Sequence, residues 1–235
     1  MTRTHFISVV IPVKNNPVGI RRVLRSLKVA RKRSPVPVEF VVVDDGSTDH
    51  TADMARQEGA RVVRTPGYGY RMGSQVFDVG KVRNTGLRAA KGDVIASIDA
   101  DCKVGPDYFR RIVAVMEHHD LVALDLRPLE TSDGQIVYKR FFDALLELTT
   151  GGASEPSLIF RRSVICPSNN CFTDQGHAEI LGVTNGHEHR MVKDPHNPVY
   201  TDFGGWRETV GWALWTAVLA AFGGGIAWLA IREPK

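Results

Sequence analysis

The stretch Asp93-Val-Ile-Ala-Ser-Ile-Asp-Ala-Asp101 decides the fold: an apolar run that ends in two aspartates separated by one residue. Its apolar residues predict a buried strand of a parallel sheet. In an extended chain, side chains at positions i and i+2 share a face, so we expect the Asp99 and Asp101 carboxylates to point the same way. A divalent metal that carries a phosphorylated ligand would offset their repulsion. The alternative is an Asx turn that contains two aspartates by coincidence.

A second apolar run, Glu39-Phe-Val-Val-Val-Asp-Asp45, also ends in carboxylates. Around these two runs, predicted strands alternate with predicted helices. The strands are expected at 6–12, 39–45, 60–64, 94–98, 121–126 and 157–161, with an edge pairing at 136–139. The helices are expected at 18–33, from a cap at Ser47 or Thr48 through Met54 to Glu58, at 81–90, from Pro106, and at 141–148. Such alternation predicts an α/β fold with a mostly parallel sheet and helices on both faces. Ligands bind at the carboxyl edge of such sheets, so two strands that end in aspartate pairs predict one shared ligand site.

Composition sets the class of partner. The 235-residue chain has a net charge of +4, which is compatible with an anionic ligand or a membrane surface. No basic block is interleaved with aromatic residues, so we expect no nucleic-acid partner. The three cysteines, an odd and sparse count, argue against a disulfide framework and favour a reducing compartment. The amino terminus lacks the pattern of a signal peptide.

Five segments, in order, resemble family 2 glycosyltransferases of the GT-A fold. The first strand and its loop, Val9 to Asn15, are similar to the family's opening segment, and Val41 to Asp49 is close to its nucleotide-binding signature. Arg83 to Leu87 followed by Ala90 to Asp93 resembles the family's RNxGL…GD segment, and Asp99-Ala-Asp101 resembles its DxD motif. The resemblance covers residues 6–115 and implies a Rossmann-like GT-A domain.

The resemblance also implies a nucleotide-diphosphate sugar as donor and Mg²⁺ or Mn²⁺ as cofactor. Asp45, with Asp44, would bind the base, and Asp101 would bind the metal. The residues expected to contact the donor are Pro12, Asn15, Asp44, Asp45, Arg83 and Asp99, and the expected metal ligands are Asp101, Asp99 and His189. Lys14 stands where the family often has an aromatic residue, so a lysine–phosphate contact is expected to replace stacking.

The sequence offers several acidic residues as candidates for the general base. The family has an acidic dipeptide after a Gly-Gly-Phe turn, and the segment Asn170 to Asp174 resembles an altered form of that turn. Glu179 is the preferred candidate and Glu188 the second, with Asp174 third. The alternative for each is a solvated surface acid.

The carboxyl-terminal tail predicts a membrane helix. The segment from Val210 to Ile231 has no charged residue, and at helical rise it is about 33 Å long, enough to cross a bilayer. Tryptophans lie near its ends, as in membrane interfaces. The alternatives are a re-entrant hairpin and a buried core helix. Gly223 to Gly225 would also permit self-association through this helix.

We therefore expect a GT-A domain at 1–205, with a nucleotide-sugar half at 1–115 and an acceptor half at 116–205, followed by a membrane segment at 206–235. The expected activity is metal-dependent, inverting transfer of a hexosyl group to a hydroxyl of a lipid-linked or cell-surface glycan acceptor. The expected location is the cell membrane, single-pass, with the catalytic domain in the cytoplasm. The alternatives are a nucleotidyltransferase and a catalytically weak nucleotide-sugar-binding subunit.

Overall fold

The computed structural model describes residues 4–68, 70–71, 76–77, 79–128, 157–172 and 192–201. In this part of the chain, eight strands form one sheet in the order β3-β2-β1-β6-β9-β8-β10-β7, and β4 pairs with β5 in a separate hairpin. The strands are β1 (Ile7–Val13), β2 (Val38–Asp44), β3 (Arg61–Arg64), β4 (Tyr70–Arg71), β5 (Val76–Phe77), β6 (Val94–Ile98), β7 (Cys102–Val104), β8 (Leu121–Pro128), β9 (Ser157–Arg161) and β10 (Val192–Thr201). The helices are α1 (Pro17–Arg31), α2 (Thr51–Gln57), α3 (Val79–Ala89), α4 (Tyr108–Val115) and α6 (Arg162–Ile165).

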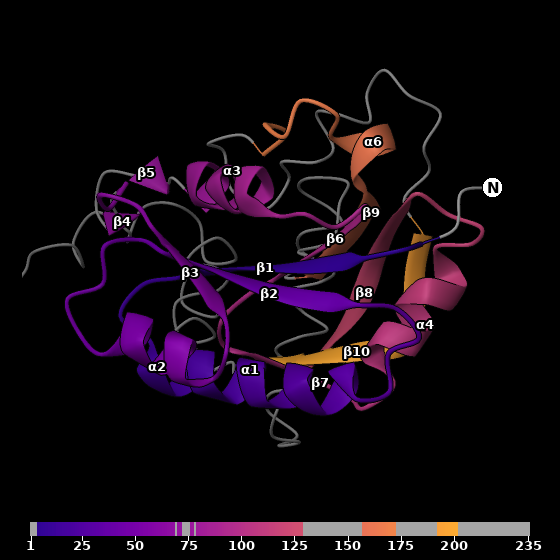
Figure 1. Cartoon of the computed structure of the whole chain (residues 1–235), viewed down its shortest axis with the longest axis horizontal. Helices are drawn as coiled ribbons and strands as arrows, with labels where there is room; N and C mark the ends of the chain where they lie inside the picture. Colours follow the sequence, from indigo (N-terminus) through magenta and orange to yellow (C-terminus); the bar gives the residue numbers. More distant parts are fainter. Residues whose placement is uncertain are drawn as a thin grey trace, which may run out of the picture.

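The sheet is mostly parallel, as the alternation of elements predicts. β3, β2, β1 and β6 form a continuous parallel half. β9 then runs antiparallel to both β6 and β8, while β10 is parallel to β8 and antiparallel to β7. The carboxyl ends of the parallel strands lie on the left of Figure 1, where α1 and α2 begin.

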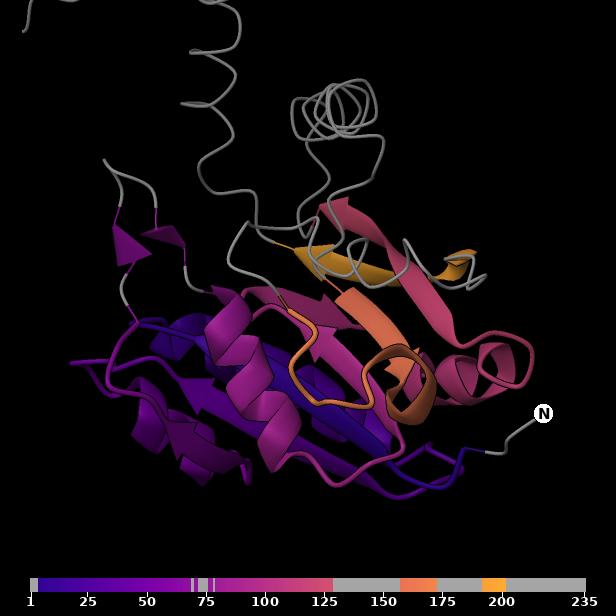
Figure 2. The ribbon, with the colours of Figure 1, turned by 90° about the horizontal axis from the view of Figure 1, so that it is seen from above.

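Helices cover both faces of the sheet. α3 lies on one face, and α1, α2 and α4 lie on the other (Figures 1 and 2). β1 separates two apolar cores because its side chains alternate: Val9 and Ile11 pack with α1, whereas Val10 packs with α3. A Cβ on Gly86 of α3 would lie 2.3 Å from Val10 Cγ1, so the close approach of this helix requires glycine.

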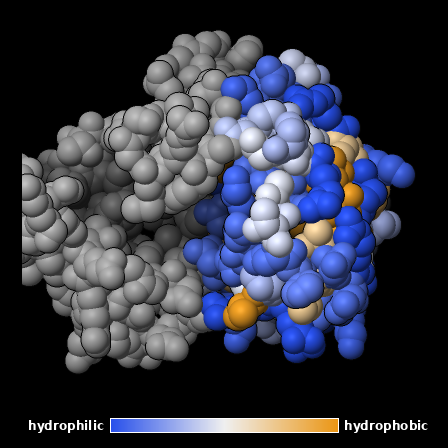
Figure 3. All heavy atoms as spheres, turned by 90° about the vertical axis from the view of Figure 1, so that its left-hand side faces the viewer, coloured by the Kyte–Doolittle hydropathy of each residue, from blue (hydrophilic) through white to orange (hydrophobic). Residues whose placement is uncertain are grey.

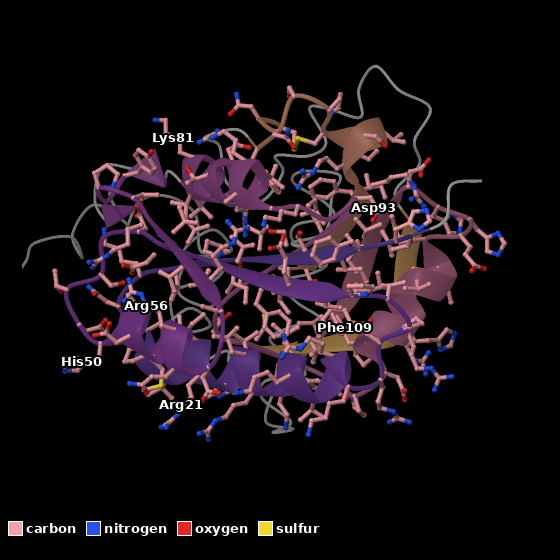
Figure 4. The ribbon with its side chains drawn as sticks, viewed as in Figure 1. Arg21, His50, Arg56, Lys81, Asp93 and Phe109 are labelled. Carbon is pink, nitrogen blue, oxygen red and sulfur yellow. A yellow bond between two sulfur atoms is a disulfide. The ribbon has the colours of Figure 1, made fainter. Side chains whose placement is uncertain are left out.

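Helix α1 starts where local chemistry requires it. Asn16 is its N-cap and accepts a hydrogen bond from Gly19 N at 2.9 Å, and Pro17 occupies the first turn. The outer face is strongly basic, and Arg21 points away from the sheet in Figure 4. The helix is joined to the end of α2 through Glu58, which accepts hydrogen bonds from Arg25 at 2.9 Å and from Lys28 at 2.5 Å.

The cysteines differ from the expectation. Cys166 and Cys171 form a disulfide with Cα atoms 5.6 Å apart, whereas the odd cysteine count predicted none. A turn between them brings two residues that are close in sequence together, which a count cannot reveal. Cys102 is buried in the core, outside this disulfide.

Several predicted segments lie outside the described residues. They are the strand at 136–139, the helix at 141–148 and the tail at 206–235. Among the helices that the structure describes, none has the length and apolar character needed to cross a bilayer.

Candidate functional site

Two acidic groups lie at the carboxyl edge of the sheet, at the ends of β2 and β6 on either side of β1. In the register of the sheet, Asp44 of β2 lies beside Val13 of β1, and Ser97 of β6 lies beside Val10. Because β1 is parallel to both neighbours, the aspartates that follow β2 and β6 emerge at the same edge. Adjacent strands are about 4.8 Å apart, so the two groups are separated by about 10 Å across the end of β1.

Asp44 and Asp45 are adjacent but have different surroundings. Asp44 is fully buried, with Arg64 Nε 2.9 Å from its Oδ2 and Ser47 N 3.3 Å from its Oδ1. Its carboxylate is therefore used within the protein to hold the turn after β2, where the sequence led us to expect a contact with the base.

Asp45 contacts a second loop, the one that follows β3. Its Oδ1 accepts hydrogen bonds from Thr65 Oγ1 at 2.6 Å and from Tyr68 N at 2.9 Å, and its Oδ2 lies 3.8 Å from Lys14 Nζ. The loop approaches closely because Gly46 and Gly67 both have positive φ, 67° and 87°. The hydrogen bonds from Thr65 and Tyr68 to Asp45 were not predicted; the two glycines are the signal in the sequence that could have indicated them.

Asn15 connects the loop after β1 to the loop after β2. Its N donates to Ser47 Oγ and its Oδ1 accepts from Thr48 N, both at 2.9 Å. Its φ of 47° is in the left-handed region, which asparagine tolerates. Pro12 lies near the end of β1, just before this loop, and is opposite Val43 in the register of β1 and β2. Both residues thus lie at the edge where the sequence predicted donor contacts.

The chain turns immediately after β6. Cys102 N donates to Asp99 O at 3.2 Å, which closes a turn over residues 99–101. Asp99 and Asp101 therefore lie in a turn after β6, which ends at Ile98, and the extended-chain argument for a shared face does not apply to them. The Asp99 carboxylate accepts a hydrogen bond from Arg83 Nη2 at 2.9 Å, and Asp101 is half-buried beside it in the turn.

A cationic arginine thus already balances one carboxylate of this turn. Arg83 is only 6% exposed, and its guanidinium lies 5.7 Å from the centre of the Phe172 ring. The resemblance placed Phe172 in the turn before the general base, but its contact with Arg83 was not predicted, because Phe172 is far along the chain and only packing reveals the contact.

The turn after β6 fits a hard cation that brings ligands of its own. Mg²⁺ and Mn²⁺ take oxygen ligands, and Mg²⁺ is commonly bound by one or two carboxylates together with waters and substrate phosphates. Asp99 and Asp101 supply two carboxylates, and no cluster of three metal-binding side chains occurs in the part of the chain that the structure describes. His189 and the candidate bases Glu179, Glu188 and Asp174 lie outside that part.

The surface at this edge is polar. Figure 3 looks onto the side of the molecule on the left of Figure 1, and the described atoms there are mostly hydrophilic. The fold and the acidic edge together define a GT-A type α/β domain, the class to which the structural neighbours described below belong.

The chain belongs to glycosyl transferase family 2, because the model of that family matches residues 8–168. The resemblance seen in the sequence is therefore confirmed.

Curated relatives match over part of their length. An undecaprenyl-phosphate 4-deoxy-4-formamido-L-arabinose transferase of Serratia proteamaculans is 28% identical over 187 residues, which cover 76% of this chain and 56% of that protein. The protein of the same name from Edwardsiella ictaluri is 30% identical over 155 residues, which cover 62% of this chain and 45% of that protein. The chain thus spans about half the length of these relatives.

Solved structures share the fold. Glucosyl-3-phosphoglycerate synthase of Mycobacterium tuberculosis, in complex with Mn²⁺, UDP and glucosyl-3-phosphoglycerate, has a TM-score of 0.63 at 21% identity and covers 92% of this chain and 79% of its own. The mannosyltransferase PcManGT of Pyrobaculum calidifontis, in complex with GDP-Man and Mn²⁺, has a TM-score of 0.61 at 18% identity, and the match covers 100% of this chain and 66% of that one.

Proposed function

We propose that this chain is a metal-dependent glycosyltransferase that moves a sugar from a nucleotide-diphosphate donor to a hydroxyl or phosphate oxygen of an acceptor. The observation that carries the proposal is the presence of two acidic groups, after β2 and after β6, at one edge of the sheet on either side of β1. Membership of glycosyl transferase family 2 supports it.

Each acidic group receives its own role. Asp45 is assigned to the base of the nucleotide, because Asp44 is fully buried against Arg64. Lys14, with its ammonium group 3.8 Å from Asp45, provides a positive charge at the same end of β1. Pro12 and Asn15 lie at the end of β1 and in the loop that follows it, at the same edge of the sheet.

The turn after β6 is assigned to the diphosphate and the metal. Asp101 and Asp99 would hold Mg²⁺ or Mn²⁺, which would supply positive charge to the leaving phosphate as the glycosidic bond breaks. Arg83 adds a fixed cation next to Asp99, where its hydrogen bond orients the carboxylate. Two neighbouring structures contain Mn²⁺ with a nucleotide or nucleotide sugar, which is consistent with this assignment.

The acceptor oxygen needs a base to remove its proton if it is a hydroxyl. Direct attack by that oxygen on the sugar would invert the anomeric centre, in the manner of a single displacement. Glu179 and Glu188 are the proposed bases, and His189 is proposed to join the metal; these roles rest on the sequence.

The proposed acceptor is a polyprenyl phosphate. The matched relatives are named as undecaprenyl-phosphate sugar transferases. The uncharged run from Val210 to Ile231 supports a membrane location, and its three consecutive glycines support self-association. A cytoplasmic catalytic domain and a single span are part of the same proposal.

The test is a donor and acceptor screen of the full chain. UDP-, GDP- and dTDP-sugars are incubated with Mn²⁺ and with undecaprenyl phosphate in vesicles, and release of nucleoside diphosphate and formation of glycolipid are measured. Metal-dependent release of nucleoside diphosphate with a matching glycolipid is expected. Pyrophosphate chemistry would instead support the nucleotidyltransferase, and tight donor binding without turnover would support a binding subunit.

A further inference from the structure

One residue of α3 holds the backbone of a segment that is distant in sequence. Asn84 Nδ2 donates to Phe172 O at 2.6 Å, and Phe172 N donates to Asn84 Oδ1 at 3.0 Å. Both residues are buried, with 4% and 5% of their surface exposed. A carboxamide that pairs with both polar groups of one residue fixes the position of that residue, because a buried amide and carbonyl are costly to leave without partners.

Arg83, the preceding residue of α3, contacts the side chain of Phe172. The Arg83 guanidinium lies over the Phe172 ring, 5.7 Å from its centre. The Phe172 ring also packs edge-to-face on Phe160, with the ring centroids 6.2 Å apart, and this second contact restricts its position. Consecutive residues of α3 therefore grip one phenylalanine, one by its backbone and one by its ring.

The segment that leads to Phe172 is itself closed. Cys166 and Cys171 form a disulfide, and Asn169 N donates to Cys166 O at 3.1 Å inside the closed turn. The disulfide ends one residue before Phe172. This turn is a second restraint on Phe172, independent of Asn84.

The restraints converge on Arg83. An arginine side chain has many rotamers, and ordering it costs conformational entropy unless its surroundings already restrict it. The Phe172 ring provides such a restriction on one side, while Asp99 accepts the hydrogen bond from Arg83 Nη2 at 2.9 Å on another. A movement of Phe172 would thus displace the cation that orients Asp99.

We propose that Asn84 and Phe172 are positioning residues that hold the Arg83 guanidinium against Asp99, so that the turn after β6 is preorganised for the diphosphate of the donor. We call the Asn84–Phe172 pair the clamp. The contribution of the clamp to donor binding rests on the proposed function, whereas its effect on the mobility of Arg83 does not.

The first test measures Arg83 directly in the full chain without ligand. ¹⁵N relaxation of the Arg83 Nε–H group is compared between wild type, Asn84→Ala and Phe172→Leu. The matched control is Phe109→Leu, the same change at a fully buried phenylalanine on the other face of the sheet (Figure 4). We expect Arg83 to become more mobile in both clamp variants and to stay as ordered as in wild type in the control. Unchanged order of Arg83 in both clamp variants, each shown to be folded, would overturn the proposal.

The second test is a double-mutant cycle on binding of UDP and of GDP, each with Mn²⁺, followed by calorimetry. Asn84→Ala is expected to weaken binding about tenfold in the wild-type chain, and less than about twofold in an Arg83→Ala chain, because coupled residues are not additive. An equal loss in both backgrounds would mean that Asn84 acts without Arg83, and would overturn the proposal. If neither nucleotide binds to wild type while Arg83 loosens as expected, the proposed function fails and the clamp stands.

Discussion

At the scale of single residues, the environment separates roles that the sequence gives to a pair. Asp44 and Asp45 are consecutive, yet Asp44 has no exposed surface and bonds Arg64, while Asp45 faces Thr65, Tyr68 and Lys14. Alternation along the end of a strand places them on opposite sides. The motif alone identifies the pair, whereas the structure shows that Asp44 is the more enclosed member, with 0% of its surface exposed against 8% for Asp45.

Asparagine substitutions at this pair should separate stability from binding. Asp44→Asn removes the charge that Arg64 contacts at 2.9 Å and is expected to lower the free energy of unfolding by about 1–3 kcal/mol. Asp45→Asn keeps the acceptor for Thr65 and is expected to cost less than about 1 kcal/mol, while weakening donor binding at least about tenfold. Urea unfolding and nucleotide calorimetry measure the two effects. The reverse order of stabilities would contradict the assignment.

The turn after β6 gives the sharpest prediction on activity. Asp101→Ala is expected to abolish metal-dependent turnover, by about 100-fold or more, because it removes a proposed ligand of the cation that stabilises the leaving phosphate. Unfolding should change by less than about 1 kcal/mol, since Asp101 is not in the core. Asp53→Ala, an exposed aspartate paired with Arg56 on α2, is the control. Full activity of Asp101→Ala without added metal would exclude the role.

At the scale of elements, hydrophobic patterns predict where helices and strands occur, but not how the strands pair. The helices α1 and α3 and the strands β1, β2 and β6 were predicted to within a few residues, because each has a clear apolar period or run. The pattern could not give the direction of β9, which is antiparallel to β6. Register and pairing partners depend on contacts between distant segments.

Four strands were not predicted, for identifiable reasons. β7 has only three residues, Cys102–Val104, and the β4–β5 hairpin has two in each strand. β10 contains Pro195 and Pro198, and its register shifts between Asp194 and Val199. Proline removes a ladder donor and is associated with edges and bulges, so such a strand lacks the usual signal. For the site, the two acidic groups were predictable from motifs, whereas the contacts of Phe172 and Thr65 were not.

The packing of α3 on the sheet depends on one missing methyl group. Gly86→Ala should destabilise the fold by about 1–3 kcal/mol although alanine is the better helix former. The added Cβ would lie 2.3 Å from Val10 Cγ1 and 3.0 Å from Val43 Cγ2, so the helix must move away from β1 and β2. Gly105→Ala is the control, because a Cβ there meets nothing within 4 Å. Equal stability of the two variants in urea unfolding would show that the helix accommodates the methyl group.

The contact between α1 and the end of α2 should be sensitive to acid. Hydrogen bonding from Lys28 lowers the pKa of Glu58 from its ordinary 4.5, against the opposing effect of burial and with help from Arg25. A carboxyl group with a lowered folded pKa stabilises the protein above its unfolded pKa, and this contribution is lost as the pH falls through the folded pKa.

Glu58→Gln tests this sign. The variant is expected to be about 2 kcal/mol less stable than wild type from pH 5 to 8, because it keeps the shape and loses the charge that faces Arg21, Arg25 and Lys28. The difference should shrink as the pH falls below 4.5, the ordinary pKa at which Glu58 of the unfolded chain takes up its proton, and should be lost as the pH passes through the lowered pKa of Glu58 in the folded chain. Urea unfolding across this range measures it. A difference that stays constant down to pH 3 would show that packing, not charge, holds the contact.

At the scale of the whole molecule, the parallel half and the mixed half have different tasks. The parallel strands β3, β2, β1 and β6 bring the two acidic groups to one edge, and the clamp links this edge to the segment that follows β9 and α6. The donor side of the proposed reaction is thus built by the parallel half. In the proposed function, the acceptor side also involves the uncharged tail, which we propose to lie in the membrane.

Removal of residues 206–235 should therefore change the use of a lipid acceptor and leave the donor untouched. A transferase held at a bilayer meets a lipid acceptor at a high effective concentration, and this advantage is lost when the anchor is removed. We expect the shortened chain to transfer sugar to undecaprenyl phosphate in vesicles at least about tenfold more slowly, with unchanged affinity for the nucleotide. In detergent, where acceptor and enzyme share no bilayer, the two chains should differ by less than about twofold. Equal transfer in vesicles would separate the tail from acceptor use, and loss of nucleotide affinity would mean that the tail supports the fold of the domain instead.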